Sequence, residues 1–241
     1  FDSGKLDPEA IAQTAFVAGR FAEKARRMGA VEVKAVATSA AREARNGIDL
    51  IEAFREVNVP LTIIEGDREA ELVLRGVRSH SDFSDGPLAI IDVGGGSTEL
   101  LVADETGLRV QHSFPLGTVR LLEQHRPSDL PTAQERAKVI EALDHFLDDQ
   151  VTPLLGTVAL PGMLVGAGGT PVFLSRILKE TDDLDATELE SLSWLLPEVQ
   201  SLTDRLWMMS LERRQALTGL PADRADVILF GAAIYEAVMM R

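Results

Sequence analysis

The sequence contains no cysteine, which excludes a disulfide framework and any thiolate metal site. Aromatic residues make up only 5% of the 241 residues, so the core must be built mainly from Leu, Ile, Val and Ala. Basic residues are also few, because 24 Lys and Arg stand against 38 Asp and Glu. We find no basic stripe and no apolar run near the roughly 18 residues of a membrane span. We therefore expect neither a nucleic-acid partner nor a membrane partner.

Helix-like and strand-like segments alternate along the chain, which predicts an α/β fold in two lobes. Residues 79–87 (SHSDFSDGP) are polar and contain glycine and proline, as linkers do. The charge balance also shifts there, from 12 Lys/Arg and 15 Asp/Glu before residue 87 to 12 and 23 after it. We therefore assign a first lobe to residues 1–86 and a second lobe to residues 87–241. We expect the apolar C-terminal helix to pack back on the first lobe.

Periodicity and capping signals predict the individual elements. Asp7 and Pro8 predict a helix start, and Thr132 with Glu135 predicts a capping box. The predicted strands are 31–37, 61–65, 88–93, 97–103, 108–116 and 163–165. The predicted helices are 8–28, a short one within 38–47, then 48–57, 66–78, one beyond residue 132, one from residue 172 and one over 224–240.

The most unusual segment is IDVGGGSTEL, residues 91–100, in which three glycines interrupt two apolar strands. Glycine lets backbone N–H groups approach a phosphate closely, and a hairpin turn would carry these donors. Asp92, at the strand end, could hold a hydrated Mg²⁺, and Ser97 adds a hydroxyl donor. Glu99 lies on the same strand face as Ser97. The alternative is a tight glycine turn that Asp92 caps.

Three further segments are candidates for binding or catalysis. Residues 166–170 (GAGGT) follow an apolar strand and precede a helix, which suits either an anion at the helix N-terminus or a close-packed turn. Thr38 and Ser39, with Arg42 one turn later, form either an oxyanion grip or an N-cap with a surface arginine. Glu69 lies in the first turn of a predicted helix, either as a solvated acid or as a general base for water. The four histidines show no metal spacing.

Six blocks in order resemble the exopolyphosphatase and guanosine-pentaphosphate phosphatase family, which lies within the actin-like, sugar-kinase-like superfamily. The blocks are ATSAAREARNG (37–47), IIEGDREAEL (63–72), IDVGGGSTEL (91–100), PLGTVRL (115–121), GAGGT (166–170) and LPADRADVILFGA (220–232). The resemblance covers nearly the whole chain and is more specific than any single loop.

The resemblance implies two ribonuclease-H-like (actin-like) lobes with a phosphate cleft between them, and Mg²⁺-dependent release of terminal phosphate. Polyphosphate is the first expected substrate, with guanosine pentaphosphate as the alternative. We also expect a cytoplasmic homodimer. By the same resemblance Glu69 is the base that activates water, and Asp92 and Glu99 organise Mg²⁺ and the water. The residues expected to bind substrate are Ser39, Arg42, Gly94, Gly95, Gly96, Ser97, Gly168 and Gly169.

The sequence departs from the family pattern in three respects. The family's opening phosphate hairpin is absent, since Asp2-Ser3-Gly4 has no preceding strand. The chain alone is expected to be inactive if that hairpin is truly missing, and complete if the full protein carries it. Arg68 replaces the acid that usually precedes the base, which could alter substrate preference. We expect the short form of the family, without the extra C-terminal helical domain of the long members, so short chains or a nucleotide are reasonable substrates. A non-catalytic binder of polyphosphate or alarmone is the alternative from another class, and Glu69, Asp92 and Glu99 argue against it.

Overall fold

Residues 4–241 are described by a computed structural model, so Asp2 and Ser3 lie outside the described residues. Contacts divide the chain into two compact units, one ending at Glu69 and one comprising Ala70–Arg241. This division falls inside helix α4 (Gly66–Arg78) and thus precedes the polar segment 79–87. The lobe boundary near residue 86 stays a prediction.

The first unit contains two long helices that pack together. Helix α1 (Pro8–Arg27) starts where predicted, because the Asp7 side chain accepts hydrogen bonds from the backbone N–H groups of Glu9 and Ala10. Helix α3 (Gly47–Glu56) packs against it. The core between them consists of small and aliphatic residues together with one phenylalanine, and includes Ile11, Ala15, Ala22, Leu50 and Phe54.

The sheet of this unit is smaller than predicted. Strand β1 (Ala35–Ala37) pairs in parallel with β2 (Leu61–Ile63) over three residues. The predicted strand over 31–37 is therefore wrong in its first four residues. Pro60 cannot donate a hydrogen bond and precedes β2, so only its carbonyl extends the ladder, to Ala35 N. Val31 is fully exposed and lies outside the sheet. Helix α2 (Ser39–Glu43) follows β1 directly.

The second unit is built on a four-stranded sheet in the order β5-β4-β3-β6. The strands are β3 (Leu88–Val93), β4 (Thr98–Asp104), β5 (Gly107–Phe114) and β6 (Leu164–Ala167). The three consecutive strands β3, β4 and β5 are antiparallel, as their hairpin spacing predicts, while β6 is parallel to β3. Every residue of β3 except Asp92 is buried, so this strand is the centre of the unit.

Helices make up most of the rest of this unit. They are α5 (Thr118–His125), α6 (Ala133–Phe146), α7 (Thr152–Leu155), α8 (Gly169–Lys179), α9 (Ala186–Ser191), α10 (Leu196–Trp207), α11 (Leu211–Gln215) and α12 (Ile228–Met239). One turn of π-helix, Leu147–Val151, joins α6 to α7. The capping box of Thr132 and Glu135 is confirmed. Helix α8 begins at Gly169, three residues before the predicted start.

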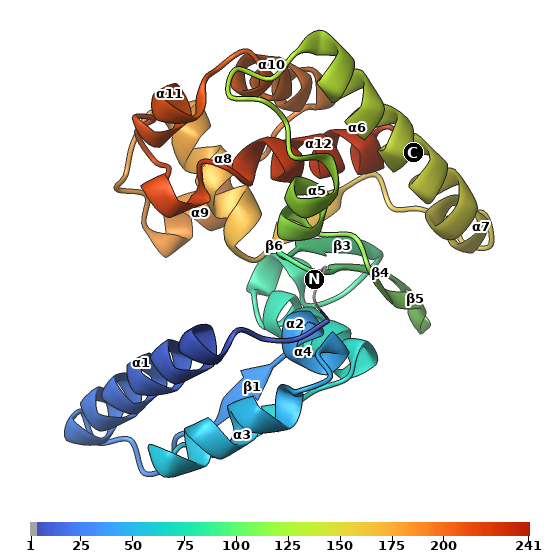
Figure 1. The fold of residues 1–241 in the computed structure, drawn as a ribbon. Helices are drawn as coiled ribbons and strands as arrows, with labels where there is room; N and C mark the ends of the chain where they lie inside the picture. The colour runs from blue at the N-terminus through green and yellow to red at the C-terminus, as the bar shows by residue number, and fades with distance from the viewer. Residues whose placement is uncertain (1–3) are drawn as a thin grey trace. The chain divides into compact units, whose positions relative to one another are not determined.

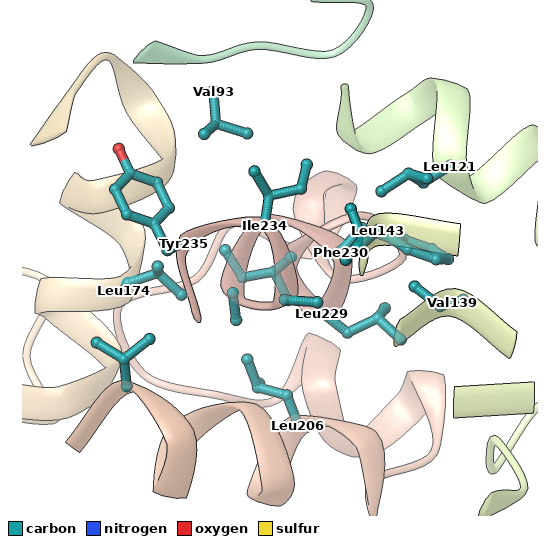
Figure 2. Packing of buried hydrophobic residues seen from close by; sticks show 14 of the residues in the cluster. Val93, Leu121, Val139, Leu143, Leu174, Leu206, Leu229, Phe230, Ile234 and Tyr235 are labelled. Carbon is teal, nitrogen blue, oxygen red and sulfur yellow. The ribbon is translucent and has the colours of Figure 1, made fainter. Parts of the chain in front are cut away.

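Helix α12 lies at the centre of the second unit. It packs against α5, α6, α8 and α10, which surround it in Figure 1. Its side chains Leu229, Phe230, Ile234 and Tyr235 are buried among those of the surrounding helices, and Val93 of β3 lies beside Ile234 (Figure 2). The expectation that α12 also packs on the first lobe stays a prediction. Among residues 4–241 no helix is both long and apolar enough to cross a bilayer.

Candidate functional site

The hairpin of β3 and β4 brings the two predicted acids into register. Asp92 is the last but one residue of β3 and pairs across the strands with Glu99 of β4. Directly opposed residues of an antiparallel pair point to the same face, so both carboxylates lie on one side of the sheet. Glu99 is only 2% exposed, and it accepts a hydrogen bond of 2.6 Å from the Ser113 hydroxyl of β5. Asp92 is half-buried and lies nearer to solvent.

The three glycines form the loop between β3 and β4, as predicted. The Gly94 N–H donates to the Ser97 carbonyl at 2.9 Å and closes the turn. None of Gly94, Gly95 and Gly96 has a positive φ, so unusual backbone angles do not account for them. Close approach accounts for two of them, because a Cβ on Gly95 would lie 3.1 Å from a methyl group of Val119, and a Cβ on Gly94 would lie 3.2 Å from the Ser97 carbonyl oxygen.

Helix α5 docks its first turn on this loop. The backbone N–H of Thr118 donates to the Gly94 carbonyl at 3.0 Å. The N–H groups of Val119 and Arg120 both donate to the Gly95 carbonyl, at 2.9 and 3.1 Å. The Arg120 side chain completes the contact, since its Nε donates to the Gly96 carbonyl at 3.0 Å. The helix start therefore contacts every carbonyl of the glycine loop.

Gly117 permits this docking. A Cβ at Gly117 would lie 2.5 Å from the carbonyl carbon of Gly95 and 2.6 Å from the nitrogen of Gly96, and closer still to the Gly95 oxygen. Real Cβ atoms do not approach backbone so closely, so only glycine fits there.

The loop after β6 lies next to Asp92. Because β6 is parallel to β3, Ala167 pairs with Asp92, and Gly168 follows at the same end of the sheet. Gly168 has φ +82° and ψ −165°, a conformation that is nearly restricted to glycine. A Cβ there would lie 3.1 Å from the Asp92 Cγ and closer to its Oδ1. Gly169 starts α8, and the hydroxyl of Thr170 donates to the Val93 carbonyl at 2.8 Å.

The first unit holds the other candidate residues. Glu69 lies in the first turn of α4, and its Oε2 is 3.4 Å from a terminal nitrogen of Arg42. The two side chains are 18% and 19% exposed, so the pair is largely sheltered from water. The same Arg42 nitrogen donates to the Ile64 carbonyl at 2.8 Å. The arginine is thus anchored to the end of β2, and it holds Glu69 in a fixed direction.

Ser39 does not present a free hydroxyl. Its side chain is buried and donates to the Glu43 carboxylate at 2.7 Å, one helical turn later. The preceding Thr38 makes no side-chain bond to the helix start, although the sequence suggested an N-cap there. The role of Ser39 in substrate binding stays a prediction.

The site residues that the sequence predicts fall into two groups, one in each unit. Within the first unit the structure brings Arg42 and Glu69 together. Within the second it brings together Asp92, the glycine loop, Glu99 and Gly168. The catalytic, substrate-binding and metal-binding roles of these residues stay predictions.

Sequence reasoning missed three residues at this end of the sheet, Gly117, Arg120 and Tyr235. The only local signal for the first two is a glycine before a helix. The Tyr235 hydroxyl points to the Ile91 carbonyl at 3.4 Å. Burial raises the pKa of Tyr235 well above its ordinary value, and the charge of Asp92 adds to this effect. The phenol therefore stays neutral beneath the strand that carries Asp92.

The carboxylates at this site suit Mg²⁺, which takes most of its ligands from water and phosphate, better than a metal ion that protein side chains alone coordinate. Among the residues that the structure describes, no three His, Asp or Glu side chains gather to hold a metal. Mg²⁺ at phosphate sites uses one or two carboxylates, with water and phosphate oxygens as its other ligands. Asp92 at the strand end, against a glycine whose missing Cβ leaves room for its carboxylate, meets that requirement.

Comparison with known proteins identifies similar chains. The profile of the "Ppx/GppA phosphatase family" matches residues 2–241. Exopolyphosphatase 2 of Mycobacterium tuberculosis is 31% identical over 242 residues, which cover 97% of this chain and 74% of that protein. A guanosine-5'-triphosphate,3'-diphosphate pyrophosphatase of Vibrio cholerae is 28% identical over 221 residues, or 90% of this chain and 42% of that protein.

Solved structures agree with these sequence matches. An exopolyphosphatase from Cytophaga hutchinsonii superposes with a TM-score of 0.84 at 27% identity, over 98% of this chain and 76% of that one. The Ppx/GppA family member of Aquifex aeolicus gives a TM-score of 0.79 at 26% identity, over 98% and 76%. The predicted α/β, actin-like fold class is thereby confirmed.

Proposed function

The chain belongs to the Ppx/GppA phosphatase family, and we propose that it is a phosphoanhydride hydrolase that releases terminal phosphate from inorganic polyphosphate. The similarity to an exopolyphosphatase over nearly the whole chain supports this choice of substrate. The observation that carries the proposal is the ion pair of Arg42 and Glu69, which holds a sheltered carboxylate in a fixed direction at the start of α4.

In this proposal Glu69 is the general base. It accepts a proton from the water that attacks the terminal phosphorus, while the phosphoanhydride bond breaks and the shortened chain leaves. A general base of this kind contributes about 10²- to 10⁴-fold to the rate. Arg42 places the carboxylate and offers its remaining donors to phosphate oxygens, and Ser39 supports α2 beside it.

The second unit would bind the phosphates. The loop of Gly94, Gly95, Gly96 and Ser97 would present backbone and hydroxyl donors, with Gly168 and Gly169 beside Asp92. We propose that Asp92 and Glu99 hold Mg²⁺ directly or through water. When bound, the ion would offset the negative charge of the phosphates, which an acidic protein otherwise repels.

Phosphate release from the full-length protein tests the function. Tripolyphosphate, longer polyphosphates and guanosine pentaphosphate are compared with and without Mg²⁺. The variant Glu69→Gln is expected to lose at least about 100-fold in rate, because an amide cannot accept the proton. Its matched control is Glu65→Gln, since Glu65 is an exposed acid four residues earlier and should tolerate the same change. Undiminished turnover of Glu69→Gln would refute the assignment of the base.

Guanosine pentaphosphate is the second candidate substrate, supported by the similarity to the Vibrio cholerae enzyme. Faster release from this nucleotide than from every polyphosphate would favour it. A protein that binds these ligands tightly and releases no phosphate would instead be a binder of polyphosphate or alarmone.

We further propose a cytoplasmic homodimer. Val17 and Phe21, one helical turn apart on the same face of α1, are 39% and 70% exposed and supply an apolar surface for an interface. The lack of cysteine suits a reducing compartment. Light scattering tests the first point, and a mass of one chain at micromolar concentration would refute it. Fractionation of cells tests the second.

A further inference from the structure

The docking of α5 determines which way the peptide groups of the glycine loop face. Each carbonyl of Gly94, Gly95 and Gly96 accepts a hydrogen bond from the first turn of α5 or from the Arg120 side chain. No cis peptide occurs in the residues described, so each carbonyl is opposed by the N–H of the next residue. The N–H groups of Gly95, Gly96 and Ser97 therefore point away from the donors that hold the carbonyls.

These three N–H groups remain available to a ligand. Within the described part of the chain none of them donates to another residue. Buried or half-buried N–H groups without a partner are rare, and consecutive ones that face the same way form an anion-binding concavity. Gly94 does not contribute, because its N–H closes the loop on Ser97.

We propose that Arg120 is a positioning residue, which together with the first turn of α5 locks the glycine loop with its three N–H groups toward phosphate. The inference rests on the proposed function. Arg120 acts on the Gly96 peptide group, because its Nε donates to the Gly96 carbonyl, which accepts no hydrogen bond from a backbone N–H group among the described residues of α5. Without the guanidinium the Gly96–Ser97 peptide can rotate, and the Ser97 N–H then no longer faces the ligand.

The contacts explain why one side chain carries this effect. Gly94 and Gly95 are held by main-chain N–H groups, which remain when a side chain is truncated to alanine. Gly96 depends on a side chain of α5, and Arg120 is half-buried, so its guanidinium is shielded from full hydration. Gly117 allows the approach of the helix start but makes no bond to the loop itself.

Binding of tripolyphosphate tests the role of Arg120 separately from turnover. Full-length Glu69→Gln protein is the parent, because its ligand stays intact during calorimetry. The added change Arg120→Ala is expected to raise the Kd about ten-fold, as loss of a hydrogen bond from a charged donor does. Millimolar guanidinium should restore part of the affinity. The matched control is Arg126→Ala, at the other end of α5, where Nε donates to the Glu123 carbonyl.

A spectroscopic measurement does not depend on the variant. In the parent, tripolyphosphate should shift the amide resonances of Gly95 and Gly96 but not that of Gly107, which starts β5 at the other end of the sheet. Unshifted Gly95 and Gly96 amides in protein that binds the ligand would overturn the proposal, even if Arg120→Ala did not fold.

The outcomes separate the two levels of inference. Equal affinity of parent and Arg120→Ala overturns the positioning role and leaves the hydrolase assignment intact. Failure of the parent to bind either tripolyphosphate or guanosine pentaphosphate overturns the proposed function first, and the role of Arg120 with it.

Discussion

Replacement of Gly168 by alanine should destabilise the protein and disturb Asp92, whereas the same change at Gly169 should do neither. The two glycines are adjacent, and sequence reasoning gave both the same role. The structure separates them. Gly168 has φ +82° and contacts the Asp92 carboxylate. Gly169 is the first residue of α8, and a Cβ there would meet only a ring carbon of Phe173, at an ordinary contact distance of 3.5 Å.

The magnitudes follow from these environments. The backbone conformation of Gly168 costs a residue with a Cβ about 1–3 kcal/mol. The overlap with Asp92 adds about 1–3 kcal/mol, unless the carboxylate moves aside. We therefore expect a loss of about 3 kcal/mol for Gly168→Ala. Gly169→Ala should gain up to about 1 kcal/mol, because alanine favours the helix.

Thermal and denaturant unfolding measure both changes. For a protein of this size, 1 kcal/mol corresponds to about 2–4 °C in Tm, so Gly168→Ala should lower Tm by about 6–12 °C. Its phosphate release should also fall and need more Mg²⁺, because the displaced carboxylate is the proposed metal ligand. Equal unfolding curves for the two variants would show that the reasoning about Gly168 is wrong.

Two further predictions concern pH. Tyr235 is the only tyrosine, so the change in absorbance near 295 nm on ionisation reports it alone. Because its pKa is raised, we expect no ionisation near pH 10 in the folded protein. The stability that the buried phenol contributes should be fully present below pH 10 and be lost as pH rises further, because the unfolded chain then releases the proton more readily. Ionisation at the ordinary pH would contradict its burial. Hydrogen bonds from the backbone of Thr132, and then from Ser128, lower the pKa of Glu135 to about 2. The stability that this cap contributes should be present above pH 4.5 and be lost as pH falls toward 2. An NMR titration of the carboxyl group should show this pKa in the wild type, and the stability of Glu135→Gln should depend less on acid.

Local signals in the sequence predicted local structure well. The caps at Asp7 and Thr132 are confirmed, because a cap requires only residues three or four positions apart. The hairpin around the three glycines is confirmed for the same reason. The strand over 31–37 was too long, since its length depends on the partner strand at 61–63, about 25 positions away.

The candidate site was less predictable because it depends on contacts between distant segments. The sequence indicates the glycine loop, but no pattern in it predicts that α5 docks on this loop. The close approach of Gly117 to Gly95 joins residues 22 positions apart and leaves no periodic signal. None of the three glycines of the loop has a positive φ, whereas Gly168 does, and the sequence pattern does not distinguish these two kinds of glycine.

The two acids that bracket the glycine loop are not equivalent, although they pair across the hairpin. Glu99 is 2% exposed and bonded to the Ser113 hydroxyl, so the protein itself satisfies part of its charge. Asp92 lies at the more open end, against a glycine that leaves room for its carboxylate. Different environments at a pair of carboxylates favour different tasks. Under the proposed function, Asp92 would therefore contact the metal directly and Glu99 would act through water. The local arrangement of these charges, rather than the total negative charge of the chain, would then determine whether a polyanion binds at this loop.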